Sequence, residues 1–131
     1  MIPVAQQIVT HNARMWLGGD GITRYEALPG AQVELADAVA THKAVLQLQG
    51  TSRHPLLVDI RAVKSISLDA RRYFAGPEHA PITTSAVALL IESPVSELIG
   101  RFFLRLDKPH FPLQLFSSET EALSWLQGYL P

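Results

Sequence analysis

The chain contains no cysteine. This absence excludes a disulfide-linked scaffold, a thiol nucleophile and every metal site built from thiolates. Long hydrophobic runs are also absent, because the longest uninterrupted apolar segment covers only residues 86–91. A membrane-spanning helix needs roughly 18–20 such residues. The amino-terminal segment has neither positive charge nor a long apolar stretch, so we expect no secretory signal and a cytoplasmic protein.

Charge is scarce and nearly balanced, with 11 Lys and Arg against 12 Asp and Glu and a formal net charge of −1. The protein therefore lacks a global field that attracts nucleic acid or anionic lipid, and we expect no nucleic acid as a partner. The hydrophobic content of 47% excludes intrinsic disorder. A length of 131 residues predicts one domain spanning residues 1–131.

Two strand-like segments, residues 8–17 and 22–28, are separated by the sequence Gly-Gly-Asp-Gly. Glycine permits the positive φ angles of tight turns, so this pattern predicts an antiparallel hairpin. A phosphate-binding loop would need a helix directly after the glycines, whereas a strand-like segment follows them here.

After the hairpin, predicted helices alternate with predicted strands. An amphipathic helix is indicated by side chains that recur at spacings of three and four, and Gly50 is placed to end it. The recurring positions are Leu35, Ala38, Val39, His42 and Leu46. Residues 56–60 and 86–91 are apolar almost throughout, which is typical of parallel strands covered by helices on both faces.

The remaining helices are predicted from their first residues. Ser67 is placed to cap residues 68–75, and Ser93 followed by Pro94 has the pattern of an N-cap and first turn. The helix after Ser93 is expected to bury five side chains, those of Leu98, Ile99, Phe102, Phe103 and Leu106. Residues 113–116 form the last predicted strand, and Ser118 and Glu121 have the spacing of a capping box for the last helix.

The resulting element order is ββαβαβαβα. An opening antiparallel hairpin followed by alternating helices and strands predicts an α/β fold with a mixed β-sheet. Right-handed crossovers are expected for its parallel steps.

Signatures of catalysis and metal binding are absent from the sequence. The five histidines are scattered singly, without the pairing at four-residue spacing that helical zinc sites use. The Gly-x-Ser-x-Gly pattern of hydrolase nucleophiles does not occur either. We therefore expect no metal, no cofactor and no enzymatic activity.

Asp59 follows the apolar part of a buried strand, at the kind of position where α/β sheets bind ligands. A carboxylate that braces the following loop fits the same position, and both interpretations stay open.

Basic and aromatic side chains on the predicted helices have two interpretations as well. Arg71 with Arg72, and Arg101 with Arg105 and Lys108, are candidates for an electropositive face, although such pairs are usually solvated surface. The aromatic candidates for a hydrophobic groove, which core packing also explains, are Phe102, Phe103, Trp125 and Tyr129.

Residues 57–70 resemble the STAS domain, which has the SpoIIAA-like fold of anti-sigma-factor antagonists. The matching positions are Asp59 at the strand end, then Val63 and Ile66 before a turn that opens a helix. The chain's final helix is similar to that of a small bacterial branch of uncharacterised STAS-like proteins. The resemblance implies a SpoIIAA-like fold and a non-enzymatic regulatory or protein-interaction module.

The family's phosphorylated serine falls at Asp69 of this chain, and the glycine after it falls at Ala70. The departure argues against switching by serine phosphorylation at the usual position, because aspartate cannot accept that ester. An aspartate at a helix start is instead favourable by roughly 0.3–1 kcal/mol, and it carries less charge than phosphoserine. Ser65 and Ser67 are the nearby hydroxyl groups.

The leading hypothesis is therefore a module that presents residues 65–73 to a protein partner. The candidate partner-binding residues are Asp59, Ser65, Ser67, Asp69, Arg72 and Tyr73. One alternative is a small binder of an apolar or lipid-like ligand, comparable with CRAL-TRIO carriers, at the region of Phe102 and Phe103. A further alternative is an enzyme with a site around Asp59 and His79. A homodimer, formed through the hairpin or an apolar helix face, is also compatible with the sequence.

Overall fold

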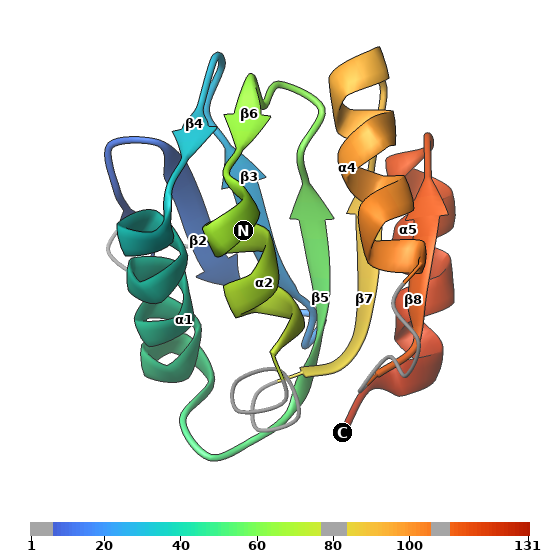
Figure 1. The fold of residues 1–131 in the computed structure, drawn as a ribbon. Helices are drawn as coiled ribbons and strands as arrows, with labels where there is room; N and C mark the ends of the chain where they lie inside the picture. The colour runs from blue at the N-terminus through green and yellow to red at the C-terminus, as the bar shows by residue number, and fades with distance from the viewer. Residues whose placement is uncertain (1–6, 77–83, 106–110) are drawn as a thin grey trace.

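The computed structural model describes residues 7–76, 84–105 and 111–131. Its main feature is a six-stranded sheet in the order β1-β2-β3-β5-β7-β8, with helices on both faces (Figure 1). The strands are β1 (Ile8–Val9), β2 (Ala13–Leu17), β3 (Thr23–Ala27), β5 (His54–Asp59), β7 (Thr84–Leu90) and β8 (Leu113–Phe116). Pairing is antiparallel from β1 to β3 and parallel from β3 to β8. The predicted α/β fold with a mixed sheet is confirmed.

The predicted hairpin between β2 and β3 is also confirmed. Leu17 pairs with Thr23 across the turn, where Gly21 has a φ of 86°. The Arg24 guanidinium donates to both carboxylate oxygens of Asp20, at 2.6 and 2.9 Å, and this contact lowers the pKa of Asp20. The glycine-rich segment is therefore a braced turn between two strands.

The prediction of one strand over residues 8–17 is wrong, because the chain reverses between β1 and β2. Ile8 pairs antiparallel with Met15, and the Thr10 amide donates to the Ala13 carbonyl at 2.9 Å. The Thr10 hydroxyl also lies 3.2 Å from Oδ1 of Asn12. Threonine and asparagine side chains that bond to nearby groups compete with strand pairing, which accounts for the reversal.

Helices cover the sheet on both sides (Figure 1). One face carries α1 (Leu35–Gln49), α2 (Leu68–Ala75) and α4 (Pro94–Leu104), and the other carries α5 (Glu119–Leu126) and the 3₁₀ turn η2 (Gln127–Tyr129). Successive side chains of β7 point alternately into two hydrophobic cores, one on each face of the sheet. Val87 and Leu89 pack with Ile99 of α4 in the first core. Ala88 packs with Leu126 of α5 in the second core. The prediction of a strand buried on both faces holds for β7.

Helix α1 ends at Gly50, as predicted, with a φ of 63° at that residue. Its buried face differs from the predicted stripe, because Leu35 is exposed. The buried positions in this helix are Ala38, Thr41, Ala44, Val45 and Gln49. Small alanine and threonine side chains line this face, and α1 makes contacts along it with α2 and β2.

A second, two-stranded parallel sheet of β4 (Gln32–Val33) and β6 (Ser65–Ile66) was not predicted. Two-residue strands are too short to show alternation in a sequence. The pairing nevertheless positions α2, since the Ser67 amide donates to the Val33 carbonyl at 2.9 Å. Helix α2 then begins at Leu68, as predicted.

Helix α4 begins at Pro94 with Ser93 as its N-cap, as predicted, and Ser93 and Ser96 form a reciprocal capping box. Ile99 is buried, and Phe102 and Phe103 are half-buried. The predicted burial of Leu98 is wrong, because this side chain is 68% exposed. Ser96, Ile99 and Gly100 form the buried side of α4, which turns Leu98 toward solvent. Leu106 lies outside the described residues.

Candidate functional site

The start of α2 brings together most of the candidate residues suggested by the sequence. Ser65 pairs with Gln32 in the small sheet and is exposed. The Ser67 hydroxyl accepts a hydrogen bond from the Ala70 amide at 3.1 Å, so it caps the helix. Asp69, in the first turn of α2, is exposed. We call residues 65–69 the α2 start segment.

Asp69 offers a fixed negative charge at the positive end of the α2 dipole. Among the described residues, no cationic side chain forms an ion pair with its carboxylate. Arg72, one turn further along α2, is exposed as well. The α2 start segment thus presents hydroxyl and carboxylate groups to solvent from a helix with a fixed, capped start.

Tyr73 has a different environment from the exposed candidates. Its ring lies edge-on to the rings of His42 and Phe74, with centroid separations of 6.2 Å in both cases. It packs with Phe74 against a buried cluster that contains Val33 and Ala70. The geometry places Tyr73 in the contact that holds α2 against α1.

Asp59 lies at the end of β5 and binds the side chain of Arg61. Its two carboxylate oxygens accept hydrogen bonds from Nε and Nη2 of Arg61, at 3.0 and 2.8 Å. These hydrogen bonds raise the pKa of Arg61, and Glu119 adds a weaker contact at 3.7 Å. Of the two interpretations of Asp59, the contacts agree with a carboxylate that braces its loop.

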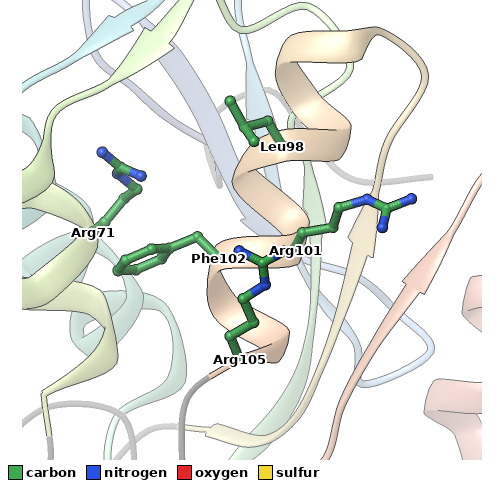
Figure 2. Close-up of a pocket in the computed structure, with 5 residues that line it drawn as sticks. All are labelled: Arg71, Leu98, Arg101, Phe102 and Arg105. Atoms are coloured by element: carbon green, nitrogen blue, oxygen red, sulfur yellow. The ribbon is translucent and has the colours of Figure 1, made fainter.

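A groove of about 330 Å³ lies between α2 and α4 (Figure 2). Its lining residues are Arg71, Leu98, Arg101, Phe102 and Arg105. The Arg71 guanidinium carbon lies 4.7 Å from the centre of the Phe102 ring. The sequence indicated these basic and aromatic residues separately, but nothing in it placed them together. Lys108, the third member of the suggested basic face, lies outside the described residues.

The other aromatic candidates are packing residues. Phe103 contacts the first core, and its ring is edge-on to Phe102 at 5.4 Å. Trp125 and Tyr129 pack against the second core, on the opposite face of the sheet, with their rings 5.0 Å apart. The alternative interpretation of core packing therefore holds for these three side chains.

The described ranges contain no group of side chains arranged as a metal site. Within residues 7–76, 84–105 and 111–131, no three His, Asp or Glu side chains are arranged to hold a metal ion. His54 makes a 2.8 Å contact from Nδ1 to the Gly21 carbonyl. His79, suggested as a partner for Asp59, lies outside the described residues. No helix in these ranges is long and apolar enough to cross a membrane.

The sequence profile of a family described as "Domain of unknown function (DUF7793)" matches residues 15–130. A protein of unknown function from Arthrobacter sp. FB24 is 37% identical, over 91% of this chain and 95% of that one, with a TM-score of 0.35. No curated protein matches the chain.

Two other solved structures are similar in fold. One is an uncharacterised protein of the DUF3478 family with a SpoIIAA-like fold from Shewanella loihica PV-4, with a TM-score of 0.58 and 18% identity over 92% of this chain and 90% of that one. The other is an anti-sigma factor antagonist from Mycobacterium paratuberculosis, with a TM-score of 0.58 and 19% identity over 88% and 92%. The SpoIIAA-like fold implied by the STAS resemblance is confirmed.

Proposed function

Because this chain belongs to the DUF7793 family and has a SpoIIAA-like fold, we propose that it is a non-enzymatic, cytoplasmic regulatory module. It binds a protein partner through the α2 start segment and the adjoining exposed face of α2. The observation that carries the proposal is the exposed Asp69 carboxylate at the capped start of α2.

The fold supports a protein as the partner. The similar structure from Mycobacterium paratuberculosis is an anti-sigma factor antagonist, which by its name acts against another protein. In this chain, Ser65, Asp69 and Arg72 are exposed. They lie on the short sheet and on α2, whose inner sides pack against a buried hydrophobic cluster. An exposed polar surface on a supported element suits docking, because little conformational freedom is lost on binding.

The chemistry of Asp69 favours a permanent negative charge at this position over a charge that is switched by phosphorylation. A phosphoserine carries nearly two negative charges and exchanges with a neutral hydroxyl, whereas the carboxylate of an aspartate is part of the chain and needs no modification. The partner is therefore expected to offer Lys or Arg side chains to Asp69, and binding at this residue does not require a kinase.

The test compares capture of proteins from a lysate of the source organism by the wild-type chain and by two charge-reversal variants. Asp69→Lys reverses the charge at the start of α2. Glu121→Lys is the matched control, because Glu121 is an exposed acid in the first turn of α5, on the opposite face of the sheet. Thermal unfolding of all three proteins checks that each variant is folded.

We expect a specific protein that binds the wild-type and Glu121→Lys chains and is captured about tenfold less by Asp69→Lys, since facing like charges across an interface are strongly unfavourable. Equal capture by Asp69→Lys would remove this residue from the interface. Capture of no specific protein would contradict the module itself. Light scattering of the purified chain separates a second copy as the partner from a different protein.

A second candidate function is the binding of a small ligand. The specific observation in its favour is the groove between α2 and α4, which contains Phe102 of the region suggested for an apolar ligand. The chemistry of the lining determines the class of ligand.

A further inference from the structure

We propose that the groove between α2 and α4 binds a small organic anion, a carboxylate or phosphate that carries an apolar group. The proposal deepens the second candidate function by naming a ligand class. It does not depend on docking of a protein at the α2 start segment, and the experiment below keeps the two separate.

The charge of the lining favours an anion. The groove is lined by three arginines, Arg71, Arg101 and Arg105, and by no acidic side chain among the described residues. Arg101 is already paired, because its Nη2 lies 2.7 Å from Glu97, and its guanidinium points away from α2 (Figure 2). Arg71 and Arg105 form no ion pair with any residue in the described ranges. Two guanidinium charges therefore remain uncompensated by described carboxylates in a protein of net charge −1.

The position of Arg71 favours a ligand with two oxygens on one group. The Phe102 ring holds the guanidinium in place by a cation–π contact. The Nε–H group of Arg71 is buried and has no acceptor among the described residues. A guanidinium binds carboxylate or phosphate through two parallel hydrogen bonds, so Arg71, held at the groove by Phe102, is suited to a ligand with two oxygens on one group.

The remaining lining favours an apolar group on the same ligand. Two apolar side chains of the groove are in contact with water, because Leu98 is 68% exposed and Phe102 is only half-buried. Covering these two side chains removes apolar surface from water. The volume of about 330 Å³ is at the lower end of the roughly 300–1,000 Å³ typical of ligand pockets, which suits a small molecule.

The experiment titrates the ¹⁵N-labelled protein with four probes and follows the backbone amide signals by NMR. Hexanoate and phenyl phosphate carry both an anion and an apolar group, and they distinguish the carboxylate and phosphate sources. Inorganic phosphate carries charge alone, and 1-hexanol carries an apolar chain alone. We expect saturable shifts at Arg71 and Leu98–Arg105 with hexanoate, phenyl phosphate or both, at concentrations where the other two probes have no effect.

Three variants test the assignment of residues. Arg71→Gln and Arg105→Gln each remove one guanidinium, and each is expected to weaken binding about tenfold or more, since tenfold is the lower end of what a hydrogen bond to a charged group contributes. Arg72→Gln is the matched control, because Arg72 is the next residue in α2 and does not line the groove. Asp69→Lys, which tests partner docking, is expected to retain the anion site.

Each contrary result overturns a defined part of the proposal. If inorganic phosphate binds as tightly as the best organic anion, the apolar group of the ligand makes no contribution, and the site recognises negative charge alone. An equal loss in Arg72→Gln and Arg71→Gln would indicate diffuse attraction without a built site. Absence of saturable shifts with every probe would overturn the proposal entirely. Arg105→Gln keeps the test valid if Arg71→Gln disturbs the packing of Phe102, because Arg105 is exposed.

Discussion

Asp59 and Arg61 form a two-point ion pair at the end of β5. Nε and Nη2 of Arg61 donate to separate oxygens of Asp59 at 3.0 and 2.8 Å, and the Arg61 amide adds a bond of 3.1 Å to Oδ1. The Asp59 side chain is 15% exposed and that of Arg61 is 34% exposed. The pair therefore closes the turn after the strand with part of its charge shielded from water.

A double-mutant cycle with Asp59→Ala and Arg61→Ala measures what this pair contributes. We expect a coupling energy of about 1 kcal/mol in urea unfolding, because paired hydrogen bonds and partial burial raise it above the median of surface pairs. The exposed pair of Glu97 and Arg101 is the matched control, with an expected coupling of about 0.3–0.5 kcal/mol. Equal coupling in the two cycles would contradict a special contribution from the Asp59 geometry.

The sequence predicted most of the architecture because the determinants of its larger elements are local. Ser67 and Ser93 cap α2 and α4 through bonds to amides three residues away, and Gly50 ends α1 with a positive φ. Capping and turn preferences of this kind are visible within a few residues. The β4–β6 pair was missed because it joins two-residue segments separated by more than thirty positions in the chain.

The candidate groove could not be predicted from the sequence for a related reason. Arg71 and Phe102 meet only because α2 and α4 lie on the same face of the sheet (Figure 1). The sequence of α4 also did not show that Ile99 is buried and Leu98 is exposed. Both residues are apolar, and the side of the helix that faces the sheet decides which of them is buried. The α2 start segment, by contrast, was predictable, since Ser67 and Asp69 have the sequence pattern of a helix start.

Thr23 and Gln49 link the last turn of α1 to β3 inside the protein. The Thr23 hydroxyl lies 2.6 Å from Oε1 of Gln49, and both residues are buried. We expect Thr23→Val to lower the free energy of unfolding by about 1–3 kcal/mol, because it removes a hydrogen bond and keeps the side-chain volume. Thr51→Val, the same change at an exposed loop position, should stay within about 0.5 kcal/mol of wild type. Similar urea midpoints for the two variants would contradict this role of Thr23.

Gly100 allows α4 to approach β8 closely, since a Cβ atom at this position would lie 2.8 Å from Cδ2 of Leu115. Alanine favours the helix by up to about 1 kcal/mol, but overpacking typically costs about 1–3 kcal/mol, so we expect Gly100→Ala to destabilise the protein. Gly128→Ala is the control, because nothing lies within 4 Å of its added Cβ, and it should stabilise by about 0.4–1 kcal/mol. Adding Leu115→Val to Gly100→Ala removes the contacted atom and should recover stability. A stabilised Gly100→Ala single variant would contradict the close approach.

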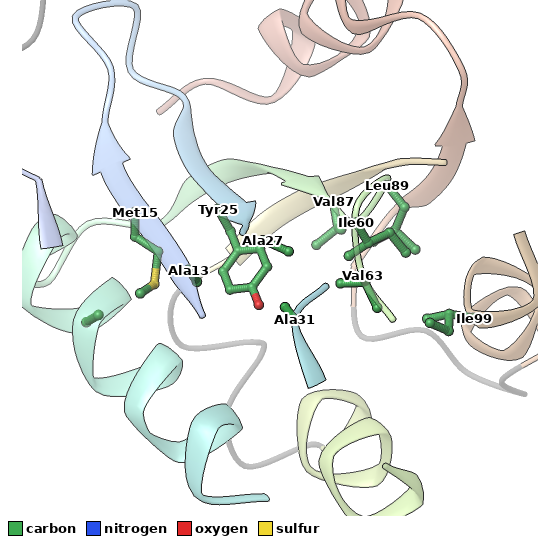
Figure 3. Close-up of a cluster of buried hydrophobic side chains, with 11 residues drawn as sticks. Ala13, Met15, Tyr25, Ala27, Ala31, Ile60, Val63, Val87, Leu89 and Ile99 are labelled. Carbon is green, nitrogen blue, oxygen red and sulfur yellow. The ribbon is translucent and has the colours of Figure 1, made fainter. Parts of the chain in front are cut away.

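Tyr25 makes stability sensitive to alkaline pH. It lies in the first core, beside Ala13 and Ala27 (Figure 3), where burial raises its pKa to about 12, with a further contribution from the charge of Asp37. In the unfolded chain the phenol ionises near pH 10, so its stabilising contribution is complete below pH 10 and decreases as the pH rises toward 12.

We expect the wild type to lose about 1.3 kcal/mol relative to Tyr25→Phe between pH 9 and pH 11, a value that follows from pKa values of 10 and 12. The measurement is urea unfolding of both proteins at several pH values in this range. The phenylalanine variant keeps the ring in the core and removes the ionisable group, so every other titrating residue contributes equally to the two curves. Parallel curves for the two proteins would show that the phenol ionises at the same pH in the folded and unfolded chains, which contradicts its placement in the core.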